Sequence, residues 1–168
     1  MLIVPFALVQ LLAGCAPSVG IVTMSAVVEY ESGAQPFAIG DNTARRSYFP
    51  ASRLAATALA LRLLRNGHNI DVGYAQVNSS NFDAYGLDAS SALDPCTNLS
   101  TASRILQTAY SGAVRTYGPG RDALVHALSA YNTGRYWAGL GYAHSLYAIA
   151  TQLRYEAPPL DVFPAGVR

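Results

Sequence analysis

Hydrophobic residues recur at intervals of three and four along most of this sequence, which is the spacing of one face of an α-helix. Pro50 near the start of one such run and Gly67 after its end follow the proline-first, glycine-last asymmetry of helices. Another run carries Met24 and Val28 on one face and stops at Gly33. Helices are predicted over residues 20–32, 50–67, 94–117, 120–133 and 140–155.

The segments between these runs lack helical spacing. Residues 34–50 combine prolines, a glycine and an Asp-Asn pair, which are typical of loops or short strands. Residues 69–82 alternate in polarity and are interrupted by Gly73, so an extended loop leading into a polar turn is predicted. The sequence has no internal repeat and no sustained heptad pattern. We therefore predict one mainly α-helical domain over residues 1–155 and a proline-rich tail over residues 156–168.

The chain opens with an apolar run, MLIVPFALVQLLAGC. A run of about thirteen apolar residues is shorter than the roughly 20 that cross a bilayer, so no transmembrane helix is predicted. The run lacks the basic start of a secretory signal, and no export signal is evident. One interpretation is a buried first helix with Val4, Leu8 and Leu12 on one face. The other is a lipoprotein cleavage site of the form LAGC, which would lead to lipidation at Cys15.

Composition narrows the classes of function. Of the 168 residues only 12% are charged, about half the usual share, and the formal net charge is +1. The basic residues are scattered arginines, so no nucleic-acid-binding face is expected. The three histidines are isolated, and Cys15 and Cys96 fit no zinc or redox motif, so no metal site is expected. The two cysteines form either one bridge, which would contribute about 4 kcal/mol in the chain-entropy model, or two separate buried thiols.

Two glutamates, Glu29 and Glu31, stand near the end of the helix predicted over residues 20–32. At about 100° per residue their side chains point about 160° apart, so they lie on different faces. Glu31 follows Val27 by four positions and Val28 by three, which places it on the apolar stripe, whereas Glu29 is expected to face water. Lost hydration and the negative end of the helix dipole both favour the neutral acid. Glu31 is therefore the candidate proton donor near neutral pH.

Four segments, taken in order and spacing, carry a family resemblance: ESGAQPFAIGDN, VGYAQVNSSNF, DPCTNL and ALSAYNTG. Together they resemble the lytic transglycosylases of type IV secretion and conjugation systems, within the soluble lytic transglycosylase and goose-type lysozyme superfamily. The resemblance covers residues 5–150 and implies a lysozyme-like, mainly α-helical domain with a small extended or β-like region. The family pattern also has a cysteine in its first helix, followed by AP, and another after DP. Both are present, so the resemblance implies a disulfide between Cys15 and Cys96 and a first helix that belongs to the domain.

The resemblance implies cleavage of the β-1,4 bond between N-acetylmuramic acid and N-acetylglucosamine in peptidoglycan, with no cofactor or metal. Glu31, in the ESG motif, would protonate the glycosidic oxygen. It would then act as a base towards the C6 hydroxyl of the muramic ring, which yields a 1,6-anhydro sugar. One carboxyl group suffices where the substrate assists its own cleavage. The expected partners are glycan strands and components of a type IV secretion system, and the expected compartment is the periplasm.

The other motif positions are expected to bind and orient the glycan. The resemblance implies that Gln76 reaches the substrate or the acid with its amide, and that the Tyr131 hydroxyl holds Glu31. Asn132 would connect the helix end to the glycan, and Gly73 would let the backbone approach the sugar closely. The implied substrate-binding set is Gly73, Tyr74, Gln76, Asn78, Tyr131 and Asn132.

This chain departs from the family pattern in the same region. Gly40 stands where the soluble enzymes often carry a serine, and GYAQV replaces GLMQI. Substrate positioning is expected to differ there. Two other functions stay open. One is a muramidase, in which water attacks the anomeric carbon and Asp41 or Asp71 is the second carboxylate. The other is a cell-wall-binding assembly protein without turnover.

Overall fold

The computed structural model describes residues 1–156, so the predicted tail lies, beyond its first residue, outside the described residues. The α-helices are α1 (Phe6–Cys15), α2 (Ile21–Ser32), α3 (Arg53–Arg65), α4 (Phe82–Tyr85), α5 (Pro95–Tyr117), α6 (Arg121–Thr133) and α7 (Leu140–Gln152), with a 3₁₀ turn at Ser79–Asn81. One sheet has the order β3 (Arg46–Tyr48), β2 (Ile39–Asp41), β4 (Ile70–Val72) and β5 (Val77–Asn78), and the other pairs β1 (Leu2–Val4) with β6 (Leu153–Tyr155). The described chain is mainly α-helical, as predicted.

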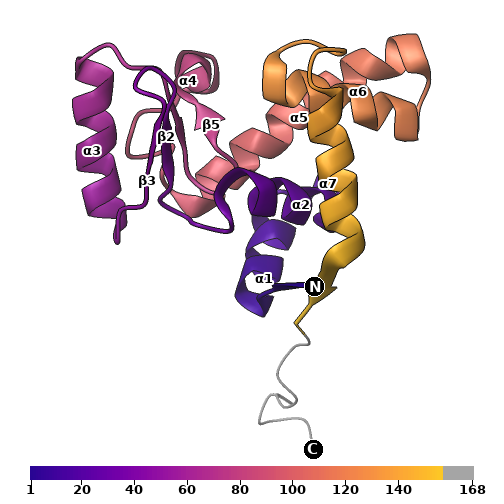
Figure 1. The fold of residues 1–168 in the computed structure, drawn as a ribbon, viewed down its shortest axis with the longest axis horizontal. Helices are drawn as coiled ribbons and strands as arrows, with labels where there is room; N and C mark the ends of the chain where they lie inside the picture. The colour runs from indigo at the N-terminus through magenta and orange to yellow at the C-terminus, as the bar shows by residue number, and fades with distance from the viewer. Residues whose placement is uncertain (157–168) are drawn as a thin grey trace, which may run out of the picture.

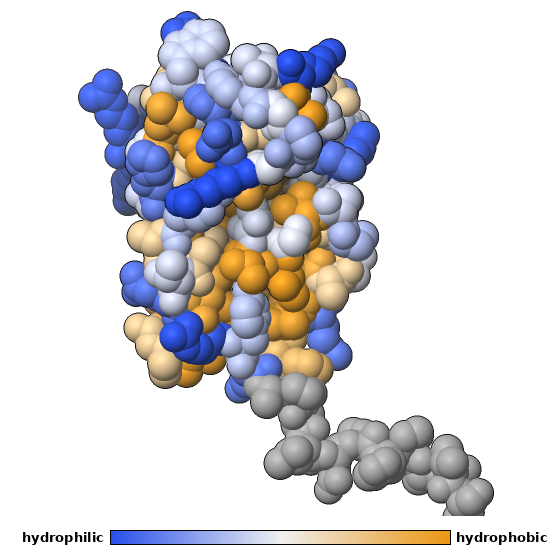
Figure 2. Space-filling view, turned by 90° about the vertical axis from the view of Figure 1, so that its right-hand side faces the viewer, coloured by the Kyte–Doolittle hydropathy of each residue, from blue (hydrophilic) through white to orange (hydrophobic). Residues whose placement is uncertain are grey.

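The long helix α5 connects the two sides of the molecule. Figure 1 shows the four-stranded sheet and α3 on one side and α6 and α7 on the other, with α2 and α5 between them. The side chain of Asp94 accepts the N–H of Thr97 and so caps α5 at its start, where Pro95 occupies the first turn. Helix α5 packs against α6 and α1, and α2 packs against α7. On the side that carries α6 and α7, hydrophobic residues gather between hydrophilic ones (Figure 2).

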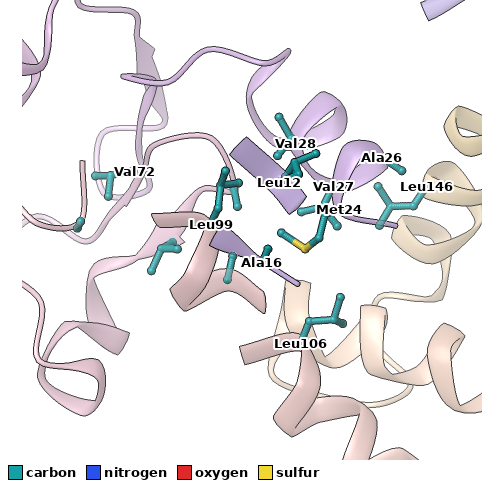
Figure 3. Close-up of a cluster of buried hydrophobic side chains, with 14 of the residues drawn as sticks. Leu12, Ala16, Met24, Ala26, Val27, Val28, Val72, Leu99, Leu106 and Leu146 are labelled. Carbon is teal, nitrogen blue, oxygen red and sulfur yellow. The ribbon is translucent and has the colours of Figure 1, made fainter. Parts of the chain in front are cut away.

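One hydrophobic core joins helices that are distant in the sequence. Side chains of α1, α2, α5 and α7 meet there, among them Leu12, Met24, Val27, Val28, Leu99, Leu106 and Leu146 (Figure 3). The apolar stripe predicted for residues 20–32 is therefore confirmed as the buried face of α2, because Val27 and Val28 are fully buried. Fully burying side chains of this size contributes roughly 1.5–3 kcal/mol each to stability.

A disulfide joins Cys15, at the end of α1, to Cys96, in the first turn of α5, with 5.2 Å between their Cα atoms. The disulfide implied by the family resemblance is thus confirmed, and α1 is part of the folded domain. The lipidation alternative is wrong for this fold, because the Cys15 sulfur is already bonded to Cys96.

The two ends of the described chain lie side by side, which the hydrophobic spacing did not predict. Val4 belongs to β1 and not to the first helix, which begins at Phe6 after Pro5. The helix predicted over 140–155 ends at Gln152, and the last three residues form β6, parallel to β1. Strands of three residues are too short to show the alternation that identifies a strand. In residues 1–156 no helix has both the length and the apolar character that a membrane span requires.

The four-stranded sheet occupies the segments predicted as loops or short strands. Its strands are antiparallel, and in their register Gly40 on β2 faces Asp71 on β4, which in turn faces Asn78 on β5. Ile39 and Val72 are paired and buried, so they fasten the sheet to the core. Polar positions next to these buried residues line a cleft beside the sheet.

Candidate active site

A polar cleft of about 580 Å³ opens between the sheet and the helices. The end of α2, strands β4 and β5, the middle of α5 and the end of α6 all contribute to its walls. Five predicted site residues line it, namely Glu31, Gln76, Asn78, Tyr131 and Asn132. Gly73 and Tyr74 are not among its lining residues. A second, apolar hollow of about 90 Å³ between α2, α6 and α7 has no carboxyl group in its walls and is no candidate for acid–base chemistry.

Glu31 lies in the last turn of α2 because that helix ends directly behind it. Gly33 adopts the left-handed conformation, with φ 58°, and its N–H donates to the carbonyl of Glu29. The hydroxyl of Tyr142, on α7, donates a hydrogen bond of 2.6 Å to Oε1 of Glu31. Glu29 is half-buried, more enclosed than the predicted solvent-facing position, and does not line the cleft.

The environment of Glu31 favours its neutral form. The pKa of this carboxyl is raised from 4.5 to about 7. Burial has the largest effect and raises the pKa, the hydrogen bond from Tyr142 lowers it, and the negative charge of Asp71 raises it. A carboxyl group with a pKa near 7 is protonated in a large fraction of molecules at neutral pH and can also act as a base. The sequence-based hypothesis that Glu31 is a proton donor therefore agrees with its surroundings.

The tyrosine that contacts Glu31 differs from the one inferred from the resemblance. Tyr131 lines the cleft, but its hydroxyl donates to the backbone carbonyl of Ala75 at 2.7 Å. The prediction that Tyr131 holds Glu31 by a hydrogen bond is wrong, and Tyr142 makes that bond. Tyr131 instead connects α6 to the loop that precedes β5. Nothing in the sequence distinguishes Tyr142 from the other tyrosines, because it stands 111 positions from Glu31.

Gly73, the glycine of the VGYAQVN segment, is required because the side chain of Asn98 packs against it. Gly73 has φ +79°, and a Cβ at this position would lie 2.5 Å from Nδ2 of Asn98. Asn98 is fully buried and donates to the carbonyls of Val72 and Ala92, while its Oδ1 accepts the N–H of Ala75. Asn98 on α5 therefore holds this loop in place. The expected close approach of Gly73 to the sugar is corrected, because the side chain of Asn98 occupies that space.

Tyr74 contributes to the same loop from its other side. Its ring is half-buried against the hydrophobic core, and its backbone carbonyl accepts a hydrogen bond of 2.8 Å from the Ser32 hydroxyl. That bond ties the loop to the end of α2, next to Glu31. The structure thus places Tyr74 as a packing residue and not as a residue of the cleft wall.

Gln76 lines the cleft, but backbone carbonyls hold its amide nitrogen. Its Nε2 donates to the backbone carbonyls of Ala38 and Gly73, at 3.2 and 2.9 Å, so both amide hydrogens are used. No hydrogen bond joins Gln76 to Glu31 within residues 1–156, and the expectation that its amide reaches the acid is not met. A Cβ on Gly40 would lie 3.0 Å from Oε1 of Gln76. Glycine in place of the family's serine therefore leaves room for this side chain.

The two aspartates considered as a second carboxylate lie in different surroundings. Asp41 is buried and accepts hydrogen bonds from the N–H groups of Thr43 and Ala44, and its Oδ2 lies 2.8 Å from Nδ1 of His68. Burial raises the pKa of Asp41, but these contacts together outweigh burial and lower the pKa, and they hold the turn between β2 and β3. Asp41 does not line the cleft, whereas Asp71 does. Only Asp71 is thus placed to act on the same ligand as Glu31.

Comparison with known families agrees with this geometry. The family described as "Transglycosylase SLT domain" matches residues 12–138, a range that includes Glu31, the loop before β5 and the end of α6. This chain belongs to the transglycosylase SLT domain family. The resemblance drawn from the four sequence segments is confirmed.

This chain is similar to curated virB1 proteins, and the name of one of them includes the type IV secretion system. The chain is 38% identical to "Protein virB1" of Agrobacterium fabrum over 156 residues, which cover 92% of this chain and 62% of the relative. It is 40% identical to "Type IV secretion system protein virB1" of Brucella abortus biovar 1 over 126 residues, which cover 74% of this chain and 53% of the relative. This chain thus spans less than two thirds of the length of these relatives. No solved structure matches it significantly.

Proposed function

We propose that this protein is a peptidoglycan lytic transglycosylase that opens the cell wall locally for a type IV secretion or conjugation apparatus. The observation that carries the proposal is the state of Glu31, whose pKa is raised to about 7 in a polar cleft and whose carboxyl accepts a hydrogen bond from Tyr142. Membership of the transglycosylase SLT domain family and the secretion-system names of its relatives support the same function.

Glu31 performs both proton transfers of the reaction. It first donates its proton to the glycosidic oxygen, so that the bond between this oxygen and the anomeric carbon breaks with its electron pair on the leaving sugar. The resulting carboxylate, stabilised by the hydroxyl of Tyr142, then accepts the proton of the C6 hydroxyl as that oxygen attacks the anomeric carbon. The product is a 1,6-anhydro sugar, and Glu31 returns to its protonated state.

The other polar residues of the cleft bind the glycan. Nε2 of Gln76 already makes two hydrogen bonds. The Oε1 atom of the same amide is an acceptor and suits an N–H or O–H donor of the sugar. Asn78 and Asn132 line the walls on the sheet side and on the α6 side. Polar side chains on both walls of the cleft are suited to a glycan strand that carries hydroxyl and acetamido groups.

Product analysis tests this function directly. Wild-type protein and the variant Glu31→Gln are incubated with purified peptidoglycan, and the released muropeptides are identified by mass spectrometry. We expect 1,6-anhydro ends with the wild type and none with Glu31→Gln, since glutamine cannot donate the proton. If the wild type released reducing ends instead, the protein would be a muramidase and not a transglycosylase. Binding to peptidoglycan with no released product from the wild type would identify a cell-wall-binding protein.

The site of action follows from the substrate. Peptidoglycan lies in the bacterial cell envelope, and a disulfide such as Cys15–Cys96 persists in oxidising compartments such as the periplasm. The periplasm is therefore the proposed location, and components of the secretion apparatus are the proposed protein partners. Fractionation of cells that produce the full-length protein would test the location.

A further inference from the structure

Asp71 occupies the cleft wall on the sheet side. It is the middle residue of β4, half-buried, and lies between Gly40 on β2 and Asn78 on β5 in the strand register. Both Asp71 and Glu31 line the cleft, and the charge of Asp71 is strong enough at Glu31 to raise the pKa of that acid. The cleft therefore holds two carboxyl groups in different environments.

Three asparagines, Asn42, Asn69 and Asn78, surround the carboxyl group of Asp71, and we call them the asparagine cage. Nδ2 of Asn42 donates to Oδ2 of Asp71 at 2.7 Å, and Nδ2 of Asn78 donates to Oδ1 of Asp71 at 2.7 Å. Each carboxylate oxygen thus accepts one amide hydrogen. Hydrogen bonds from neutral donors hold a carboxylate in place without cancelling its charge.

Hydrogen bonds among the three asparagines set the orientation of their amide groups. Oδ1 of Asn69 accepts from Nδ2 of both Asn42 and Asn78, at 2.9 and 2.8 Å, and Nδ2 of Asn69 donates to Oδ1 of Asn78. The amide groups of Asn42 and Asn78 must therefore turn their nitrogens, and not their oxygens, towards Asp71. The asparagine cage therefore does not need to rearrange when a cation forms in front of Asp71. Such preorganisation is what electrostatic catalysis requires.

The charge of Asp71 is left available to a ligand. Within residues 1–156 the ion pairs join Arg53 to Asp94 and His68 to Asp41, so no basic side chain there neutralises Asp71. Gly40, directly opposite Asp71 in the register, carries no side chain; a Cβ there would lie 3.8 Å from Oδ2 of Asp71. Glycine at position 40 thus leaves room for the side chains of both Gln76 and Asp71.

We propose that Asp71 is a second catalytic residue, whose carboxylate stabilises the positive charge that develops at the anomeric carbon while Glu31 protonates the leaving oxygen. This inference rests on the proposed function, which assigns only one carboxyl group. As the glycosidic bond breaks, its electrons go to the leaving oxygen and the sugar ring becomes cationic. The carboxylate of Asp71 faces this cation and takes no proton in either step. The bond to the C6 oxygen then forms, Glu31 takes the hydroxyl proton, and the cationic charge disappears.

A neutral acid beside an ionised carboxylate is the division of roles that glycosidic cleavage uses when two carboxyl groups take part. Here Glu31 is buried and accepts a hydrogen bond from Tyr142, whereas the carboxylate of Asp71 accepts hydrogen bonds from the asparagine cage. The titratable groups around Glu31 come from three elements: Tyr142 from α7, Tyr131 from α6 and Asp71 from β4. Asp71 is the only acid among them, so its removal has a defined effect on Glu31.

The variant Asp71→Asn tests the inference, with Asp122→Asn, an exposed aspartate in the first turn of α6, as the matched control. Rates are measured against pH on soluble, uncross-linked peptidoglycan chains, and the melting temperature is recorded for each variant. We expect Asp71→Asn to lower kcat about 100-fold, as the loss of one preorganised electrostatic group does in other enzymes. Its basic limb should also move to lower pH by roughly half a unit or more, because Glu31 loses a negative neighbour. Asp122→Asn should change neither.

The charge-conserving variant Asp71→Glu separates electrostatics from folding. It keeps a negative charge in the cleft, so the basic limb should stay near its wild-type pH, while kcat falls because the charge is displaced by one methylene group. If Asp71→Asn does not fold, this comparison of kcat and limb position with the wild type decides the question. The inference is overturned by a kcat within threefold of the wild type in either folded variant. An unchanged limb in Asp71→Asn also overturns it, even if the melting temperature falls.

These outcomes are distinct from a failure of the proposed function. If the wild type releases no 1,6-anhydro muropeptides, the proposed function fails and the role of Asp71 falls with it. If the wild type releases them and Asp71→Asn does so at the same rate, only the role of Asp71 is wrong.

Discussion

The hydrogen bond between Tyr142 and Glu31 offers the sharpest test of how this site controls its acid. The change Tyr142→Phe removes one oxygen atom and leaves the ring in its place. Tyr142 is only 5% exposed, and its ring packs edge-on against Tyr30 with 4.9 Å between the ring centroids. We therefore expect the fold to tolerate the change at a cost of about 1 kcal/mol, the usual net contribution of one hydrogen bond.

The effect on Glu31 follows from the sign of the hydrogen bond. The Tyr142 hydroxyl lowers the pKa of Glu31 against the larger effect of burial, and the balance lies at about 7. Hydrogen bonds to charged groups contribute about 1.5–3 kcal/mol, which corresponds to roughly one to two pKa units. In Tyr142→Phe the pKa of Glu31 should thus rise from about 7 to roughly 8–9.

Two measurements follow this rise. A carbon-detected NMR titration reports the Glu31 carboxyl directly, and the basic limb of the pH–rate profile should move upward with it. At pH 6, where Glu31 is protonated in both proteins, the rate should fall about 10- to 100-fold, because the carboxylate formed in the first step has lost its donor. Tyr147→Phe, on the same helix but outside the cleft, is the control. A pKa that stays at its wild-type value or falls in Tyr142→Phe would refute this account of Glu31.

Three further predictions concern stability. Because the folded-state pKa of Glu31 is raised from 4.5 to about 7, the folded protein binds more protons than the unfolded chain between these values. The stability of the wild type therefore falls as the pH rises through this range. Relative to the wild type, Glu31→Gln should gain about 3 kcal/mol of stability from pH 4.5 to pH 7 in urea titrations. Replacing Cys15 and Cys96 together by serine should lower the unfolding free energy by about 4 kcal/mol, and equal urea midpoints for the two proteins would contradict this. Gly73→Ala should destabilise the protein by about 2–4 kcal/mol in thermal unfolding, because its Cβ would lie 2.5 Å from Asn98 at φ +79°.

Local signals in the sequence were sufficient for most of the helices and for the position of Glu31 at the end of α2. Proline at the start and glycine after the end of a periodic run predicted α3, and the structure adds that the Ser52 side chain caps it by accepting the N–H of Ala55. The stripe on α2 separated Glu31 from Glu29 by helix geometry alone. These inferences succeeded because a helix repeats within a few residues, so neighbouring positions suffice to define its faces.

The short strands and the loop geometry were not predictable in this way. Strands of two or three residues provide too few positions for an alternation to be recognised, and β1 and β6 pair across almost the whole chain. Nothing in the local sequence distinguishes Asn98 from other polar residues of α5. Its role in holding the loop at Gly73 depends on a contact between residues 25 positions apart, which only the folded chain brings about.

The sequence by itself determined most of the helices, the candidate acid Glu31 and, through family resemblance, the disulfide between Cys15 and Cys96. Tertiary structure alone decided what controls that acid: Tyr142 donates to it from 111 residues away, and Asp71 faces it from the sheet with each oxygen held by an asparagine. The physical reason is that hydration and charge at a carboxyl group depend on everything within a few ångströms of it, and most of those neighbours are remote in the chain.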